Sequence, residues 1–379
     1  MYNPRKFSFL SLIIMLTIFS ISAAGCGGGK KETGSASEAL PEKRELSALS
    51  VGSAPQAGEI FSLLPGTFSS KKGLFVGTGA GLYFYDTDAK STTQVIDNEG
   101  ILKTAKIKAI CQEEGGKLWL GTDNEIFAYN FTSVRKFDEN HVQAIIQTSG
   151  GEIWAATNYG LLLYDGNKGF SKFTRKSDNL PNDDVVCFGK EEKAKGIYAG
   201  TRQGLIVVDG PKLFSTKTGT SSKITPSGEV IEEPGNTEMA GNTVSAIASN
   251  SKGVLYIGTN MGINRCKNFN NWSVFSADSE VTTKTSSGIG FKKVKGNSEL
   301  LSNWIRSIYI DADDSLWIGT TKGLSFFNGD NKWESYTTAN GLGSNTVNAV
   351  AGINKAVFIG TASGLFLLDF PKKPEKQAK

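Results

Sequence analysis

One short phrase recurs seven times along the chain and limits the possible folds more than any other feature. Each copy has an aromatic residue, a variable residue and Gly-Thr, then two variable residues and usually Gly-Leu with a short apolar run. The third copy has Ala-Thr in place of Gly-Thr. The copies lie at 75–78, 119–122, 154–157, 198–201, 256–259, 317–320 and 358–361. Three of the six spacings are 44, 44 and 41 residues. They match the ~40–45 residues that are typical of a four-stranded propeller blade.

The repeats predict an all-β chain. Each of the first six divides into four short strands, and no stretch has the 3.6-residue period of an amphipathic helix. A single blade cannot bury both faces of its sheet, so we expect seven four-stranded blades to form a closed β-propeller over residues 44–370. The last repeat lacks a fourth strand, because Pro371 and Pro374 stand among lysines in a basic tail over 371–379. We therefore expect residues 44–51 to supply that strand and close the ring.

The amino terminus has the pattern of an export signal. A cationic segment (1–6) precedes 15 apolar residues (7–21), and small residues lead to Cys26. This arrangement resembles a bacterial lipobox, although Ala23 stands where leucine is preferred. We expect a signal peptide over 1–25, a Cys26 thiol that carries acyl chains such as palmitate, and a flexible tether over 26–43. The alternative is an ordinary signal peptide followed by an incidental cysteine.

A lipid-anchored protein of this kind would lie in the bacterial cell envelope, on the extracytoplasmic side of a membrane. Gly27 is not the aspartate that commonly retains lipoproteins at an inner membrane. If the cell has two membranes, this favours the outer one, on its periplasmic or its surface side.

Charge and composition argue against several classes of function. Loss of residues 1–25 would lower the formal net charge from +4 to +2, because Arg5 and Lys6 leave with them. That charge is too small for a nucleic-acid footprint. The chain has one histidine, His141, and no motif that pairs a nucleophile with a base. We therefore expect no enzyme activity, no cofactor and no metal; a propeller lyase or hydrolase is the least favoured function.

Two sets of residues, an aspartate cluster and three cysteines, have the side chains of a metal site or a reactive thiol but not the sequence pattern of one. Asp311, Asp313 and Asp314 imitate the start of a calcium loop, but its glycine and closing glutamate are missing, so a turn between two strands is favoured. Three cysteines besides Cys26 lie in strand-like runs, and we expect them to be buried as small hydrophobic residues. They are Cys111, Cys187 and Cys266. The repeated aromatic residue is expected in the core between blades.

Residues 313–324 (Asp-Asp-Ser-Leu-Trp-Ile-Gly-Thr-Thr-Lys-Gly-Leu) closely resemble the two-component regulator propeller repeat, as do the loops 340–347 and 180–185. The resemblance covers about residues 44–370. It implies a propeller of the kind that forms the extracytoplasmic, ligand-binding part of sensor kinases, often for carbohydrate signals. No membrane helix, immunoglobulin-like domain or kinase is recognised after the repeats. The resemblance therefore implies binding, and signalling does not follow from it.

In such a propeller the connections between blades share one face with the turns between second and third strands. Candidate ligand-binding residues on this face mix aromatic, amide and charged groups, which suits a polar organic ligand. They are Tyr159, Arg202, Gln203 and Lys322 in the turns, and Asp184, Trp304, Arg306 and Asn348 where first strands begin. The alternative is that these turns are polar because they are wet.

Two insertions, 216–241 and 277–302, lengthen the connections before the fifth and sixth blades, on that same face. Long loops in compact domains tend to be functional or disordered. The sequence predicts a membrane-anchored binding protein that serves as an interaction scaffold for an envelope protein. A glycan- or small-ligand-binding propeller is the alternative, and the sequence does not indicate an oligomeric state.

Overall fold

A computed structural model describes residues 44–51, 58–190, 196–209, 214–224, 230–285, 288–330 and 332–369. The expected signal peptide, the expected lipidation site Cys26, the tether and the basic tail lie outside these residues. No helix among the described residues is both long and apolar enough to cross a membrane.

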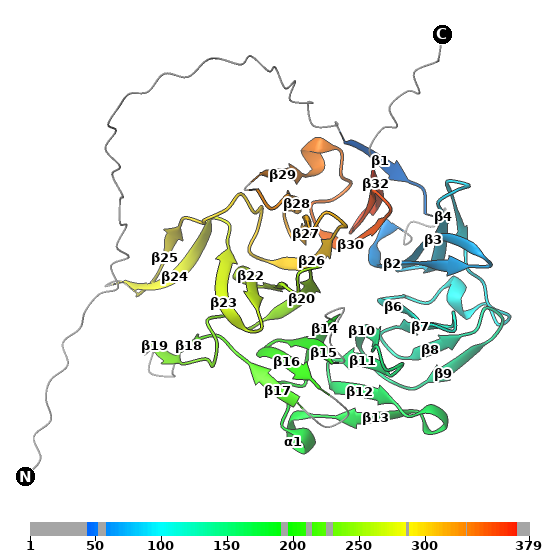
Figure 1. Cartoon of the computed structure of the whole chain (residues 1–379), viewed down its shortest axis with the longest axis horizontal. Coiled ribbons are helices and arrows are strands. Elements are labelled where there is room, and N and C mark those ends of the chain that lie inside the picture. Colours follow the sequence, from blue (N-terminus) through cyan, green and yellow to red (C-terminus); the bar gives the residue numbers. More distant parts are fainter. Residues whose placement is uncertain are drawn as a thin grey trace, which may run out of the picture. The chain divides into compact units, whose positions relative to one another are not determined.

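The described chain forms seven four-stranded antiparallel sheets arranged in a ring (Figure 1). The prediction of a seven-bladed β-propeller is confirmed. Each of the first six blades uses four consecutive strands, and the first of them faces the centre of the ring (Figure 1).

The first three blades contain β2 (Ile60–Phe68), β3 (Lys71–Thr78), β4 (Gly81–Asp86) and β5 (Ser91–Gln94); β6 (Ala109–Gln112), β7 (Leu118–Gly121), β8 (Ile126–Tyr129) and β9 (Val134–Phe137); and β10 (Val142–Gln147), β11 (Ile153–Thr157), β12 (Gly160–Tyr164) and β13 (Phe170–Phe173). The next three contain β14 (Val185–Lys190), β15 (Ile197–Thr201), β16 (Gly204–Val208) and β17 (Phe214–Lys217); β20 (Val244–Ser249), β21 (Leu255–Thr259), β22 (Gly262–Lys267) and β23 (Asn270–Phe275); and β26 (Ile305–Ile310), β27 (Leu316–Thr320), β28 (Gly323–Phe327) and β29 (Trp333–Tyr336).

The seventh blade joins the two ends of the propeller. Its inner strands are β30 (Val347–Ile353), β31 (Ala356–Thr361) and β32 (Gly364–Asp369). Its outer strand is β1 (Glu45–Leu49), which pairs antiparallel with β32 from Glu45 opposite Asp369 to Leu49 opposite Leu365. The prediction that the amino-terminal strand closes the ring is confirmed.

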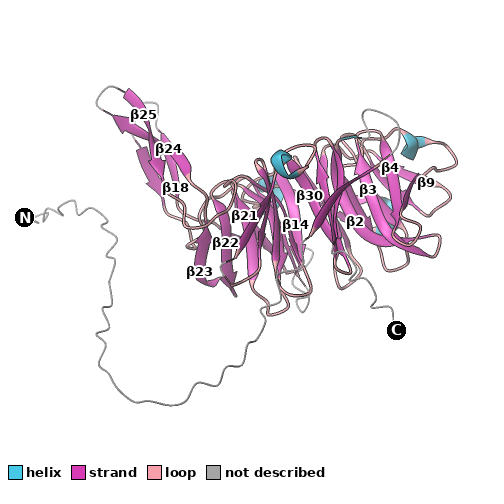
Figure 2. Ribbon diagram, turned by 90° about the horizontal axis from the view of Figure 1, so that it is seen from above, coloured by secondary structure: helices cyan, strands magenta, loops and turns pink. Residues whose placement is uncertain are grey.

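The two insertions form β-hairpins, which the sequence pattern did not predict. β18 (Ser221–Ile224) pairs with β19 (Val230–Glu233), and β24 (Ser279–Thr285) pairs with β25 (Gly288–Val294). Both hairpins rise from the same side of the ring (Figure 2). Described helical segments are short; they are α1 (Arg175–Asp178), η2 (Ile101–Lys103), η3 (Gly166–Lys168) and η4 (Thr338–Asn340).

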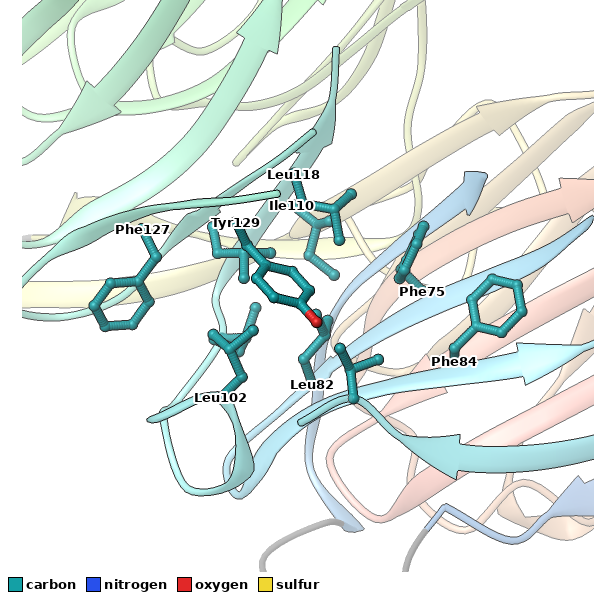
Figure 3. Packing of buried hydrophobic residues seen from close by; sticks show 11 residues of the cluster. Phe75, Leu82, Phe84, Leu102, Ile110, Leu118, Phe127 and Tyr129 are labelled. Atoms are coloured by element: carbon teal, nitrogen blue, oxygen red, sulfur yellow. The ribbon is translucent and has the colours of Figure 1, made fainter. Parts of the chain in front are cut away.

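The core lies between neighbouring blades. Figure 3 shows one such cluster, in which Phe75 and Phe84 of the first blade pack with Ile110, Leu118 and Phe127 of the second. The repeated aromatic residue takes an equivalent place around the ring, and Trp119, Trp154 and Trp317 are at most 1% exposed. The expectation that these aromatic residues are core is confirmed for six of the seven, whereas Tyr198 of the fourth copy is only partly buried.

The glycine of the repeated phrase lets each blade approach the next. A Cβ atom on Gly121 would lie 2.4 Å from Cγ1 of Val142, the first residue of the next blade, and one on Gly200 would lie 2.6 Å from Cγ1 of Val244. The same contact closes the ring, because a Cβ on Gly360 would lie 2.6 Å from Cγ2 of Ile60. These separations are too short for carbon atoms, so glycine at this position sets the spacing of the blades.

The threonine of the phrase shapes the turn between the second and third strands. In the first blade, Thr78 Oγ1 accepts a hydrogen bond from the Ala80 amide and donates one to the Gly81 carbonyl. Gly81 has φ +115°, a conformation open to glycine and strained for other residues. The pattern recurs in other blades, for example at Thr201 and Gly204, where φ is +122°.

Candidate functional site

The connections between blades and the turns between second and third strands lie at the same end of every sheet. We call this side the loop face. Contacts across blades show the proximity, since the His141 amide donates to the Asp123 carbonyl and the Gly262 amide donates to the Asn303 carbonyl. Both hairpins belong to connections between blades and so rise from the loop face (Figure 2).

The seven innermost strands surround a central cavity of about 320 Å³. Six of them have a β-bulge directly after their first residue, where the register with the neighbouring strand shifts. A bulge re-aims a side chain away from the regular pleat. The bulged residues and Lys108, which precedes β6, all line the cavity near the loop face. We call them the mouth ring; it comprises Phe61, Lys108, Gln143, Val186, Ser245, Arg306 and Asn348.

The mouth ring is polar in five of its seven members, whereas the wall beyond it is mostly apolar, with Ser62, Cys187 and Ser307 also among the residues that line the cavity. Two positions after each mouth-ring residue, an apolar side chain lines this wall. These residues are Leu63, Ile110, Ile145, Phe188, Ile247, Ile308 and Val350. A cavity with a few convergent polar groups over an apolar surface is the usual form of a small-molecule site.

Two predicted residues, Arg306 and Asn348, belong to the mouth ring and contact each other. Arg306 Nε donates to Asn348 Oδ1 at 2.9 Å, and Asn348 Nδ2 donates to the Ile60 carbonyl at 2.9 Å. These bonds link the sixth, seventh and first blades. Burial lowers the pKa of Arg306, and the Glu59 carboxylate acts in the opposite direction.

Lys108 carries a second positive charge of the mouth ring. Its Nζ atom lies 3.0 Å from Asp123 Oδ1, and Lys106 Nζ lies 3.4 Å from Asp123 Oδ2. Burial alone would raise the pKa of Asp123, but the two ammonium groups bring it below its ordinary value. Lys106 also lies over the Phe61 ring, 4.8 Å from its centroid.

The other predicted residues lie around the rim of the loop face. Arg202 Nε contacts Asp184 Oδ2 at 2.7 Å, which joins two loops of the fourth blade. Tyr159 is 51% exposed and packs edge-on against His141, with ring centroids 5.7 Å apart. Gln203 is exposed beside Arg202.

Lys322 and Trp304 lie on the rim at the sixth blade. Lys322 lines a cleft of about 680 Å³ at the base of the β24–β25 hairpin, together with Lys293, Val294 and Lys295. Trp304 is 58% exposed. Of the eight predicted residues, the structure thus brings two pairs into contact and spreads the rest around the rim.

Every large hydrophobic side chain that is exposed in the described part of the chain lies on the loop face. These side chains belong to connections between blades or to turns between second and third strands, and they are Ile96, Tyr159, Met261, Val294 and Trp304. The opposite face has none among the described residues.

The two hairpins are held at their bases by the same hydrogen-bond pattern. In the first insertion, Asn236 accepts from the Thr218 amide and donates to the Thr216 carbonyl. In the second, Asn297 accepts from the Ser276 amide and donates to the Val274 carbonyl.

A second asparagine completes each base. Asn242 bonds both backbone groups of Gly219, and Asn303 bonds both backbone groups of Ala277. The insertions are therefore attached to the ring in a defined and repeated way.

The carboxylates of the calcium-like segment have structural partners. Asp311 accepts hydrogen bonds from the Asp313 and Ser315 amides and from Trp317 Nε1, and Asp314 binds both polar groups of Ser251. Across the described residues, no three His, Cys, Asp or Glu side chains form a group that could hold a metal ion.

The three cysteines that the structure describes are free thiols. Cys111 and Cys266 are buried as expected, whereas Cys187 is only partly buried and lines the central cavity. Burial raises the pKa of Cys111 and Cys266 to about 11 and that of Cys187 to about 12.

Sequence reasoning missed five of the seven mouth-ring residues: Phe61, Lys108, Gln143, Val186 and Ser245. The signal was present, because in each repeat a branched aliphatic residue begins the first strand and the ring residue follows it. A bulge, however, turns this side chain toward the cavity, whereas simple alternation along the strand would point it to the other side of the sheet.

Comparison with protein families supports the reading of the repeat. The two component regulator propeller model matches residues 299–322. The chain carries this repeat. No curated protein sequence matches the chain.

Several solved structures have a similar fold. The extracellular domain described as part of a one component system from B. thetaiotaomicron has a TM-score of 0.61 and 20% identity, over 86% of this chain and 40% of that one. A catalytically inactive virginiamycin B lyase from Staphylococcus aureus, solved with quinupristin, has a TM-score of 0.58 and 12% identity, over 86% and 99%.

PorZ, a surface component of the type-IX secretion system of Porphyromonas gingivalis, has a TM-score of 0.53 and 15% identity, over 84% of this chain and 47% of that one. The chain therefore spans less than half of the first and third of these proteins. At such identities the similarity shows the propeller fold.

Proposed function

We propose that this chain is an extracytoplasmic binding protein, anchored by lipid at Cys26, whose loop face docks a protein partner in the bacterial envelope. The observation that carries the proposal is the confinement of the exposed large hydrophobic side chains to that one face. These side chains are spread around the rim, but Met261 and Trp304 belong to neighbouring segments, because the Gly262 amide donates to the Asn303 carbonyl. Adjacent exposed apolar side chains of this kind can mark an interaction site.

The composition of this surface fits a protein partner. Trp304 and Tyr159 are large amphipathic side chains of the type that dominates binding energy at interfaces, and Met261 adds an adaptable apolar contact. Charged and amide side chains such as Arg202, Asp184 and Gln203 surround them, as in the polar rim of an interface. The two hairpins extend the same surface outward.

Export and anchoring rest on the amino terminus and on the kinds of protein that share the fold. Residues 1–25 have the pattern of a signal peptide, and Cys26 follows small residues as in a lipobox. The similar structures include an extracellular domain and a surface component of a secretion system.

We propose binding and not catalysis. The similar lyase is described as inactive once a histidine is replaced by alanine. In this chain His141 is the one histidine, and its ring packs edge-on against the exposed Tyr159 ring on the rim. General acid–base catalysis needs a side chain positioned to transfer a proton to or from the reacting group, and we assign His141 no such role.

A second candidate function is the binding of a glycan to the rim. It is favoured by the exposed aromatic rings of Tyr159 and Trp304, on which sugar rings can stack, and by nearby groups such as Gln203 that can bond hydroxyls.

The test is crosslinking in the native cell, followed by purification and mass spectrometry of the captured proteins. We expect one partner in stoichiometric amount, lost when Trp304→Ala and Met261→Ala are combined. Lys355→Ala, at an exposed turn on the opposite face, is the matched control and should keep the partner. Recovery of the protein alone, or a partner that survives the Trp304 and Met261 changes, would contradict docking at the loop face.

If no partner is captured, a glycan screen by thermal shift decides the second candidate. Stabilisation by a glycan that is lost in Tyr159→Ala would replace the scaffold proposal.

A further inference from the structure

The mouth ring and the cavity behind it form a site that docking at the rim does not use. The cavity of about 320 Å³ lies on the propeller axis, with polar side chains toward the loop face and aliphatic or aromatic ones beyond. Its size is at the lower end of the range for small-molecule pockets. A suitable occupant is therefore small, with one polar end and one apolar end.

Arg306 determines which polar end fits. A guanidinium has five N–H donors in a planar fork. Within the described residues, one of them is engaged, in the bond from Nε to Asn348 Oδ1. That bond fixes the plane of the group, and the two terminal nitrogens have no acceptor among the residues that the structure describes. A planar fork with free terminal nitrogens matches a carboxylate, which can accept two parallel hydrogen bonds.

Lys108 and Arg306 are the charged residues that line the cavity, and both are positive, which agrees with an anionic occupant. Their charged neighbours leave a positive balance. Arg306, Lys106 and Lys108 contribute three positive charges, while Asp123, which bridges the two lysines, and Glu59, which acts on Arg306, contribute two negative ones. The local balance is positive by one. The Lys108 side chain is 18% exposed, so an opposite charge is attracted more strongly there than at the open surface, whereas Arg306 is exposed.

The apolar wall decides against a purely inorganic ion. Leu63, Ile145, Phe188 and Ile308 are among its lining residues, and they offer no hydrogen bond from a side chain. An inorganic anion would leave this surface in contact with water, whereas an apolar tail would cover it.

We propose that the mouth ring binds a small organic carboxylate, with its carboxylate on Arg306 and its apolar body along the central cavity. Gln143 and Ser245, which also line the cavity, donate their side-chain hydrogens within the protein, to Asn158 Oδ1 and to the Ile305 carbonyl, so their oxygens can accept from a hydroxyl group of such a compound. The site is distinct from the exposed rim residues Trp304 and Met261, so partner docking and carboxylate binding can fail independently.

The experiment is isothermal titration calorimetry of the purified propeller with carboxylates and their neutral counterparts. The probes are hexanoate with hexanamide, benzoate with benzamide, and acetate as a carboxylate that lacks an apolar body. We expect hexanoate or benzoate to bind, their amides to bind at least about tenfold more weakly, and acetate to bind more weakly than either.

Two variants locate the site. Arg306→Gln removes the charge, and Asn348→Asp keeps the side-chain shape but places a carboxylate on Arg306 from within the protein. Both should weaken binding of hexanoate or benzoate at least about tenfold. Arg265→Gln, an exposed arginine on β22 away from the cavity, is the matched control and should bind as the parent does.

Three results would overturn the proposal. They are absence of carboxylate binding at millimolar concentration, equal binding of acetate and hexanoate, or unchanged binding in folded Arg306→Gln and Asn348→Asp. Thermal unfolding of each variant shows that it is folded, and the pair of variants keeps the test valid if one of them does not fold.

Discussion

At the scale of single residues, the glycine and the threonine of the repeated phrase determine how neighbouring blades pack and how the following turn is formed. Its glycine stands against the first aliphatic residue of the next blade, as Gly121 does against Val142. Its threonine closes the turn that follows. Both roles follow from the recurrence of the phrase, because a residue kept at one repeat position has one environment repeated around the ring. The mouth-ring position also recurs, but its side chain differs from blade to blade, as Arg306 differs from Ser245. The recurrence therefore marks the position and does not predict the contacts of its side chain.

Gly121→Ala should destabilise the ring by about 1–3 kcal/mol, because the added methyl group meets Val142 Cγ1 at 2.4 Å and the blades must move apart. Urea unfolding followed by tryptophan fluorescence measures the change. Gly150→Ala is the control, since its nearest neighbour would be Thr148 Oγ1 at 3.6 Å. Equal effects of the two substitutions would show that the spacing of the blades does not depend on this glycine.

The thiols should make the folded state less stable in alkali. Burial raises the pKa of Cys111 and Cys266 from 9.0 to about 11 in the folded protein, so the unfolded chain loses these protons first as the pH rises. The contribution of these protonated thiols to the unfolding free energy is fully present below pH 9.0, and it decreases as the pH rises from 9.0 to about 11. Each thiol contributes a slope of about 1.4 kcal/mol per pH unit in that range.

Unfolding free energies measured across this pH range test the prediction. Comparison with a Cys111→Ala, Cys266→Ala double variant separates the thiols from tyrosines such as Tyr129, whose pKa burial also raises. The double variant should give a flatter curve, and an identical slope would contradict the assignment.

At the scale of elements, the blades and the closing strand were predictable, whereas the bulges and the hairpins were not. Strand order followed from the repeat, and β1 followed from a missing fourth strand next to Pro371. The hairpins arise in insertions that break the period, where neither the turn nor the register is marked. Their base asparagines, Asn236 and Asn297, are recognised only once the two insertions are compared in space.

The closing strand should contribute strongly to stability. Leu46 and Leu49 of β1 pack against two different core clusters, and Arg44 lies 3.8 Å from the centroid of the Phe326 ring and 4.7 Å from that of Trp317. A chain that begins at residue 52 should lose at least about 3 kcal/mol of unfolding free energy relative to one that begins at residue 44. Chemical denaturation of the two chains measures the difference, and equal stability would show that β1 is dispensable for closure.

At the scale of the whole molecule, the structure has two parts: the ring of seven blades and the two hairpins on its loop face. Seven sheets pack side by side through their cores, while β18–β19 and β24–β25 are separate two-stranded sheets. The sequence located this division, because both insertions fall outside the repeat. The sequence could not show which residues of each insertion belong to the ring and which to the hairpin. Ala277 and Leu300, for example, are buried by contacts with strands elsewhere in the chain.

That boundary yields the last prediction. Replacing residues 279–294 with a short glycine turn should leave the unfolding temperature nearly unchanged, because β24 and β25 pair only with each other. Deleting 277–302 should instead cost several kcal/mol, because Ala277, Leu300 and Ser302 are at most 5% exposed. Scanning calorimetry distinguishes the two variants. If both unfold like the parent, the insertion is not built into the ring. If both variants have a much lower unfolding temperature than the parent, the hairpin is part of the core, and its removal could not be used to test partner docking.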